Sequence, residues 1–253
     1  MIFTMSSSGL ISVFLSLLAV LVPPLATKVL AAPPVGATFE PPPGEGAPRG
    51  GTAGGASRPV RTACLPNSSV NSAALTAMAP RHGIGLSQSD RPNLFVYIPQ
   101  TTAQTAEFSL FDEQMKGIYQ VSVPVSQAGL VNIGLPDTAP SLVKEQTYYW
   151  TVALVCNPDD RTEDWVVGGW VEHVGKNDTF KQELEKVTAI ERVSLYAQQG
   201  FWYDALNTLV ELQRSQPYNP EVAATWTELM ESVELDVISL TLSQAYTTQP
   251  VRD

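Results

Sequence analysis

The 253-residue sequence contains only two cysteines and two histidines, which limits the metal sites it can form. A structural zinc site with four tetrahedral ligands would use all of them, so we expect neither a metal nor another cofactor. Basic residues are also scarce, because 15 Lys and Arg accompany 25 Asp and Glu, for a formal net charge of −10. An acidic chain without a basic run does not suit a phosphate backbone, and we expect no nucleic acid partner.

Common catalytic motifs are missing as well. The sequence has no G-x-S-x-G or H-E-x-x-H pattern, and His82 and His173 stand in no catalytic context. We therefore assign no catalytic residue and expect a protein that is not an enzyme. The alternative is a hydrolase whose carboxylates converge only in the fold.

The amino terminus has the features of an export signal. Leu10–Val22 is an apolar run of 13 residues, too short to span a bilayer comfortably. Val29-Leu30-Ala31 provides small residues for cleavage before Ala32, so residues 1–31 are predicted to be a signal peptide. The region before Leu10 has no Lys or Arg, which leaves an uncleaved anchor as the alternative. With no later apolar run, we expect a protein of the periplasm or envelope, or a secreted one, without a transmembrane segment after cleavage.

Residues 32–60 are predicted to be a disordered linker. Pro33–Pro59 contains seven prolines and seven glycines, and its only large apolar side chains are Val35 and Phe39. Such a segment buries too little surface to offset the entropy of ordering it.

Residues 61–175 show the pattern of an antiparallel β-sandwich. Turn-forming residues recur every 8–15 positions, and the runs between them are short, rich in β-branched and aromatic residues, and without a helical period. Such a series indicates two packed sheets, as in immunoglobulin and fibronectin-III folds. The predicted strands are residues 74–78, 94–98, 106–111, 118–123, 130–135, 148–156 and 166–173.

One predicted strand carries a more specific signal. Leu142 is followed by Tyr148, Trp150 and Val152, and the last three side chains share one face of a strand. This pattern resembles the tyrosine-corner strand of immunoglobulin-like domains, in which the Tyr148 hydroxyl would bind the preceding loop.

The two cysteines are predicted to form a disulfide. Cys64 precedes the first strand and Cys156 ends the tyrosine-corner strand, and paired cysteines in an exported protein indicate a bridge. The alternative is a reactive thiol, which would need a nearby base.

The loop after Cys156 is the candidate ligand or partner loop. Its clustered carboxylates could bind calcium or act in acid–base chemistry, although the spacing is not that of an EF-hand. Trp165 and Trp170 nearby could form a platform for a sugar, with core packing as the alternative. The plainer interpretation is a hairpin loop with an Asx turn and an internal Arg–Asp pair. The candidate residues are Asp159, Asp160, Arg161, Glu163 and Asp164.

Residues 176–236 are predicted to be helical, followed by a flexible tail over 237–253. Asp178 is a predicted N-cap, Gly200 separates two helices, and a third begins at Glu221. The spacing of Tyr196, Ala205 and Pro217 is similar to a single tetratricopeptide unit. The fold class is thus α+β, a sandwich followed by a helical hairpin. The candidate interaction face of these helices is Trp202, Trp226, Glu228 and Glu231.

Six motifs follow one another along the sequence, namely Leu75–Pro80, Phe95–Pro99, Ala106–Leu110, Tyr148-x-Trp150, Cys156–Arg161 and Gly200–Leu206. In this order they resemble the cyanobacterial DUF928 family, a domain of unknown function. The resemblance covers about residues 61–235, and it implies a cyanobacterial envelope protein without assigning an activity. We therefore expect a non-enzymatic interaction or structural module whose partner is another envelope protein. The alternative is a module that binds carbohydrate or calcium through the Asp159–Asp164 loop.

Overall fold

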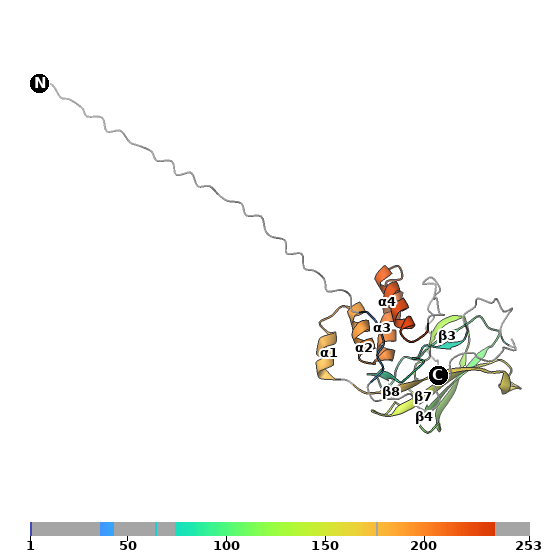
Figure 1. Cartoon of the computed structure of the whole chain (residues 1–253). Coiled ribbons are helices and arrows are strands. Elements are labelled where there is room, and N and C mark those ends of the chain that lie inside the picture. Colours follow the sequence, from blue (N-terminus) through green and yellow to red (C-terminus); the bar gives the residue numbers. More distant parts are fainter. Residues whose placement is uncertain (2–35, 43–63, 65–73, 176, 236–253) are drawn as a thin grey trace. The chain divides into compact units, whose positions relative to one another are not determined.

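The structure is a computed structural model that describes residues 1, 36–42, 64, 74–175 and 177–235 (Figure 1). Except for Met1, the predicted signal peptide lies outside these residues, as do the predicted tail and most of the predicted linker.

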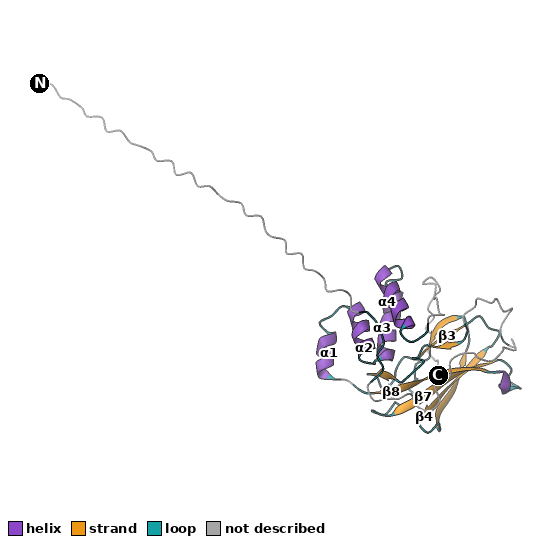
Figure 2. Ribbon diagram, in the orientation of Figure 1, coloured by secondary structure: helices purple, strands orange, loops and turns teal. Residues whose placement is uncertain are grey.

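The described strands form two sheets (Figure 2). A three-stranded antiparallel sheet has the order β1-β3-β6, from Thr76–Ala77, Phe95–Ile98 and Gly129–Asn132. A five-stranded sheet has the order β2-β8-β7-β4-β5, from Gly85–Ser87, Trp165–His173, Thr147–Val155, Thr105–Asp112 and Gly117–Pro124.

The predicted alternation explains how these sheets build the core. Leu110 is opposite Trp150 and Phe108 is opposite Val152 in the β4–β7 pair, and all four side chains are fully buried. Phe95 in the other sheet belongs to the same hydrophobic cluster. Burial of one face of each sheet therefore holds the two together.

The prediction of purely antiparallel sheets is wrong at one edge. β2 pairs in parallel with β8, with Leu86 opposite Glu172. We predicted no strand there, because Gly85–Ser87 is only three residues long and has no alternating pattern. Contacts from the helices stabilise it, since the Leu86 N–H donates to the carbonyl of Gly200 at 2.9 Å.

The predicted role of Tyr148 is confirmed. Its hydroxyl accepts a hydrogen bond from the backbone N–H of Val143 and donates one to Oε1 of Gln146, both at 3.1 Å. Leu142, which precedes this loop, is buried. The strand is thus tied to the loop that leads into it.

The predicted disulfide is also confirmed. Cys64 and Cys156 are joined across 92 positions of sequence, with their Cα atoms 5.1 Å apart. The carbonyl of Cys64 also accepts hydrogen bonds from the Thr102 N–H and the Thr101 hydroxyl. The bridge therefore attaches Cys64 to the end of β7, and the hydrogen bonds of its carbonyl attach it to the loop before β4.

Side chains cap the first, second and fourth helices, whereas the third, which follows Phe201, has no side-chain cap. Asn177, rather than the predicted Asp178, caps the first helix, and Thr188 forms a capping box with Glu191 at the second. Gly200 has a φ of +77°, a value that favours glycine and lets the chain turn between the second and third helices. The helices are α1 (Asp178–Leu184), α2 (Ala189–Gln198), α3 (Trp202–Ser215) and α4 (Pro220–Glu231).

In the described part of the chain, no helix combines the length and hydropathy of a membrane span.

Helix α3 packs directly on the sheets, so the predicted sandwich (61–175) and helical subdomain (176–236) share one core. The indole N–H of Trp202 donates to the carbonyl of Met78 at 2.8 Å. A Cβ atom at Gly85 would lie 2.7 Å from the Tyr203 ring, and one at Gly169 would lie 2.4 Å from Cβ of Ala79. Gly85 therefore allows α3 to approach the sheet closely, and Gly169 allows β8 to approach the segment after β1.

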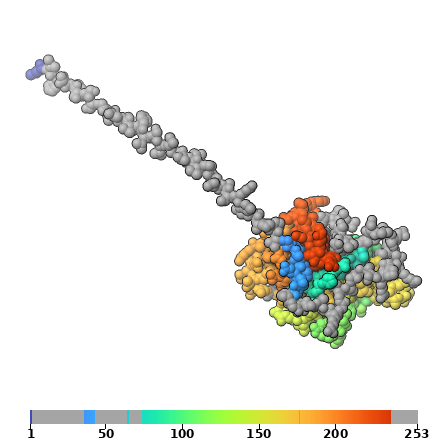
Figure 3. Space-filling view, viewed as in Figure 1, coloured from blue at the N-terminus to red at the C-terminus, as the bar shows by residue number. Residues whose placement is uncertain are grey.

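The prediction of a disordered linker is wrong for residues 36–42, which pack against the helices (Figure 3). Phe39 is buried and its ring meets that of Trp202 edge-on, with centroids 5.5 Å apart. The N–H groups of Ala37 and Phe39 donate to Glu228 and Ser232 of the α4 region, both at 3.1 Å. The composition argument missed this because the surface that covers Phe39 belongs to a distant part of the sequence.

Candidate functional site

Acidic groups of the loop after β7 form hydrogen bonds and ion pairs with other residues of the same loop. Asp160 begins the short 3-10 helix of residues 161–163 and accepts hydrogen bonds from the hydroxyl and the backbone N–H of Thr162. These bonds lower the pKa of the Asp160 carboxyl. The N–H of Asp159 donates to Oδ1 of Asn157, which forms the expected Asx turn.

The predicted Arg–Asp pair is present in this loop. Arg161 donates from Nε to Oδ2 of Asp164 at 2.6 Å and pairs with Glu107 of β4 at 3.2 Å. Both hydrogen bonds, that to Glu107 first, raise the pKa of the guanidinium. Within the described residues, no three His, Cys, Asp or Glu side chains gather as a metal site would require. The plainer interpretation of a structural hairpin loop accounts for the contacts of Asp160, Arg161 and Asp164, whereas Glu163 is half-buried beside them.

The tryptophans of the neighbouring strands offer little open ring surface. Trp170 is buried against Tyr149, with ring centroids 4.8 Å apart. Trp165 is half-buried against the core. A sugar platform needs an exposed ring, so the core-packing alternative applies to Trp170.

The predicted interaction face on the helices is wrong for both of its tryptophans. Trp202 and Trp226 are buried in the shared core. Glu228 and Glu231 are both exposed, and Glu228 also accepts the hydrogen bond from Ala37. The helical period showed which residues share a face, but it could not show which face meets the sheets and residues 36–42.

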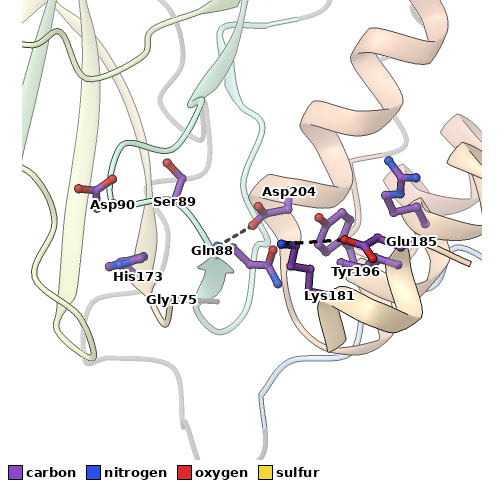
Figure 4. Close-up of a pocket in the computed structure, with 11 residues that line it drawn as sticks. Gln88, Ser89, Asp90, His173, Gly175, Lys181, Glu185, Tyr196 and Asp204 are labelled. Atoms are coloured by element: carbon purple, nitrogen blue, oxygen red, sulfur yellow. Dashed lines mark hydrogen bonds and ion pairs between the residues drawn. The ribbon is translucent and has the colours of Figure 1, made fainter. Parts of the chain in front are cut away.

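A different site lies where the sheets meet the helices, in an open cleft of about 760 Å³ (Figure 4). One wall is formed by Gln88, Ser89 and Asp90 after β2 and by His173 and Gly175 at the end of β8. The opposite wall and floor come from α1, α2 and α3, with Lys181, Leu184, Glu185, Arg192, Tyr196 and Asp204. Below we call this the junction cleft.

Asp204 is the ionisable group most changed by this environment. Burial raises the pKa of its carboxyl to about 6, against the opposing effects of hydrogen bonds from Gln88 and Ser87 and of the nearby His173. Its Oδ2 accepts the N–H of Gln88 at 2.9 Å, and Nδ1 of His173 lies 3.3 Å from the carbonyl oxygen of Ser87. Asp204 therefore attaches α3 to the segment after β2 and changes charge near neutral pH.

The helical wall holds donors that the protein itself does not use. Among the described residues, neither the guanidinium of Arg192 nor the hydroxyl of Tyr196 has a side-chain hydrogen bond or ion pair, and Nε of Arg192 is shielded from solvent. The amide nitrogen of Gln88 is also buried without an acceptor. Lys181, in contrast, pairs with Glu185 at 3.9 Å.

The sequence analysis missed these residues because no short motif contains them. They come from separate segments that converge only in the fold. One local signal was available, since Asp204 interrupts a run of buried side chains, Trp202, Tyr203, Ala205 and Leu206. An acidic group in such a position indicates a buried polar contact.

These observations define an α+β protein in which the helices pack on two sheets. The cleft between the helices and the sheets is lined by both acidic and basic groups. The chain belongs to the DUF928 family, described as a domain of unknown function, whose model matches residues 53–242. The family resemblance of the motifs is thus confirmed. No curated protein matches the chain.

Proposed function

We propose that the protein is an exported, non-enzymatic binding module that holds a protein partner of the cell envelope in the junction cleft. The observation that carries the proposal is the set of uncommitted donors that line the cleft, Arg192 on the helical wall and Gln88 on the wall opposite. Buried polar groups are normally satisfied, so Arg192 and Gln88 in an open cleft are suited to bind an external acceptor.

The disulfide supports the exported location. Bridges such as Cys64–Cys156 persist in oxidising compartments and are rare in the cytosol. This agrees with the signal peptide predicted over residues 1–31.

The finer assignment of the fold is part of the same proposal. The hydrogen bond between Tyr148 and Val143 supports an immunoglobulin-like sandwich. Gly200, which lies between α2 and α3, has a positive φ, and Ala205 in α3 is fully buried. Both features support a tetratricopeptide-like hairpin. Such a sandwich and hairpin would hold the walls of the cleft rigidly.

A hydrolase is the second candidate, and Asp204 is the observation that favours it. A carboxyl with a pKa of about 6 in a cleft is suited to acid–base catalysis. Its hydrogen bond to Gln88 gives it a structural role, which is why we place this candidate second. Hydrolysis of chromogenic ester, glycoside or phosphate substrates that Asp204→Asn abolishes would favour the enzyme.

The contacts of the Asp159–Asp164 loop give no support to carbohydrate or calcium binding there. Asp160 is engaged by Thr162, and Asp164 by Arg161.

Two neighbouring glutamates at the C-terminal end of α1 allow a matched test of the binding module. Both are exposed, but Glu185, which directly follows the helix, lines the cleft, and Glu183 in its last turn does not. Glu185→Trp would obstruct the cleft, and Glu183→Trp makes the same chemical change outside it. We expect crosslinked partners from a native envelope extract to be recovered with the wild type and Glu183→Trp, and lost with Glu185→Trp. Equal recovery with all three proteins, or no reproducible partner, would contradict the proposal.

A further inference from the structure

Arg192 differs from two other arginines of the fold in having no partner of its own. Arg161 bridges Glu107 and Asp164. Arg91 donates to the carbonyls of Pro136 and Ala139 at 2.6 and 2.8 Å. In the described residues Arg192 makes no comparable contact, although it lines the junction cleft and its Nε is out of contact with solvent. Its planar fork of donors is therefore available to a ligand.

Two further donors lie in the same cleft. Tyr196 follows Arg192 by four residues on α2, so the two side chains share one face of the helix. Burial, with a smaller effect of Asp204, raises the pKa of Tyr196, so its hydroxyl stays protonated and can donate. The side-chain amide of Gln88 contributes a donor from the segment after β2. A guanidinium fork with neighbouring neutral donors matches the two oxygens of a carboxylate.

The other charges of the cleft favour a ligand with a single negative charge. Among the described residues that line the cleft, the cations are Lys181 and Arg192, and the acidic groups are Asp90, Glu185 and Asp204. Glu185 is paired with Lys181. A doubly charged phosphate would meet the remaining carboxylates, Asp90 and Asp204, and of the described lining residues Arg192 is the one unpaired permanent cation. A carboxylate meets less repulsion, and still less when Asp204 is protonated.

The depth of these groups also matters. Ser89, Asp90, Lys181 and Glu185 are exposed at the rim, whereas Arg192, Gln88 and Asp204 are partly buried. A chain end can enter such a cleft while the rest of the chain leaves over the rim. Leu184 and the ring of Tyr196 add apolar surface for a terminal side chain.

We propose that the junction cleft binds the carboxy-terminal carboxylate of a polypeptide, and that Arg192 is the residue that holds it. This inference rests on the proposed binding function and names the part of the partner that the cleft binds.

The test uses the purified full chain and two matched pairs of probes, measured by isothermal titration calorimetry. One pair is a random hexapeptide pool with free or amidated carboxyl termini. The other is trigalacturonic acid and its methyl ester, which present a sugar carboxylate or none. We expect the free-acid peptides to bind at least tenfold more tightly than the amides at pH 5, where Asp204 is mostly protonated, and more weakly at pH 8, where Asp204 is ionised.

Variants then assign the contact to Arg192. Arg192→Gln is expected to weaken the binding of the free-acid peptides at least tenfold and to leave the affinity for the amides unchanged. Arg192→Lys keeps the charge without the fork and is expected to fall between the two. Lys116→Gln removes a positive charge from the exposed turn before β5 and is expected to have no effect. Circular dichroism checks that each variant is folded.

Each other outcome overturns part of the inference. Equal binding of acid and amide, or no binding of either, excludes the carboxylate. If the protein binds trigalacturonic acid and not the peptides, the ligand is a sugar acid. If Arg192→Gln binds the free-acid peptides as tightly as the wild type does, Arg192 is not the residue that holds the carboxylate. Envelope partners lost from Glu185→Trp would in all these cases still support the proposed function, so the two can fail separately.

Discussion

The indole nitrogen of Trp150 donates a hydrogen bond of 2.8 Å to the hydroxyl of Tyr203. That hydroxyl donates in turn to the carbonyl of Trp170 at 2.9 Å, and all three residues are buried. The bond joins β7 to α3 across 53 positions of sequence. A single phenol thus satisfies two polar groups in the core that the sheets and helices share, and burial raises its pKa so that it remains a donor.

Replacement of Tyr203 by phenylalanine tests this link. The change removes both hydrogen bonds, so the buried Trp150 N–H loses its acceptor and the buried Trp170 carbonyl loses the donor that Tyr203 supplies. We expect the free energy of unfolding to fall by about 1–3 kcal/mol for each group left unsatisfied. Urea denaturation measures it, with Tyr218→Phe as the control because Tyr218 is 96% exposed. A similar change in both variants would show that the link does not stabilise the core.

The disulfide gives a second prediction. A bridge across 92 positions restricts the unfolded chain, and its loss is expected to cost roughly 2–5 kcal/mol. Reductant should therefore lower the melting temperature of the wild type and leave that of Cys64→Ala/Cys156→Ala unchanged. If the melting temperature of the wild type stays the same when the bridge is reduced, this expectation is contradicted.

Strands with strong local patterns could be predicted from the sequence, and those held by tertiary contacts could not. The alternation of Tyr148, Trp150 and Val152 is sufficient to mark β7. β2 carries no such pattern, because it exists through its pairing with β8 and the contact of Leu86 with Gly200. The same limit applies to residues 36–42, since the surface that buries Phe39 is formed by the helices.

The candidate site was harder to predict than the fold. Acidic residues close together in sequence indicated the loop at Asp160 and Asp164, yet their short spacing lets them satisfy one another and the turn. The donors of the junction cleft, Arg192 and Gln88, are more than 100 positions apart. Local spacing reveals sites made from one segment, and this cleft depends on how α2 and the chain after β2 are placed.

Residues 36–42 provide a third prediction. Phe39→Ala removes a ring packed edge-on against Trp202 and is expected to lower the free energy of unfolding by about 3 kcal/mol. Thr38 is exposed in the same segment, so Thr38→Ala is the matched control and should change stability by less than about 0.5 kcal/mol. Equal unfolding midpoints for Phe39→Ala and the wild type would show that the segment adds nothing to the stability of the fold.

Asp204 predicts a specific dependence of stability on pH. Its pKa is about 6 in the folded chain and near 3.8 in an unfolded one, so between these values the folded state binds more protons. The free energy of unfolding therefore falls as the pH rises from 4 to 7, because ionisation of a buried carboxyl disfavours the folded state.

Asp204→Asn isolates this effect, because the amide keeps an oxygen that can accept the Gln88 N–H and does not titrate. The stability of the wild type relative to Asp204→Asn should fall by about 2–3 kcal/mol between pH 4 and pH 7.5. Urea denaturation at several pH values measures it, and Glu183→Gln, an exposed change on α1, should keep the wild-type profile. A difference between wild type and Asp204→Asn that stays constant across this range would mean that Asp204 titrates alike in the folded and unfolded chains, and that the cleft does not shield it from water.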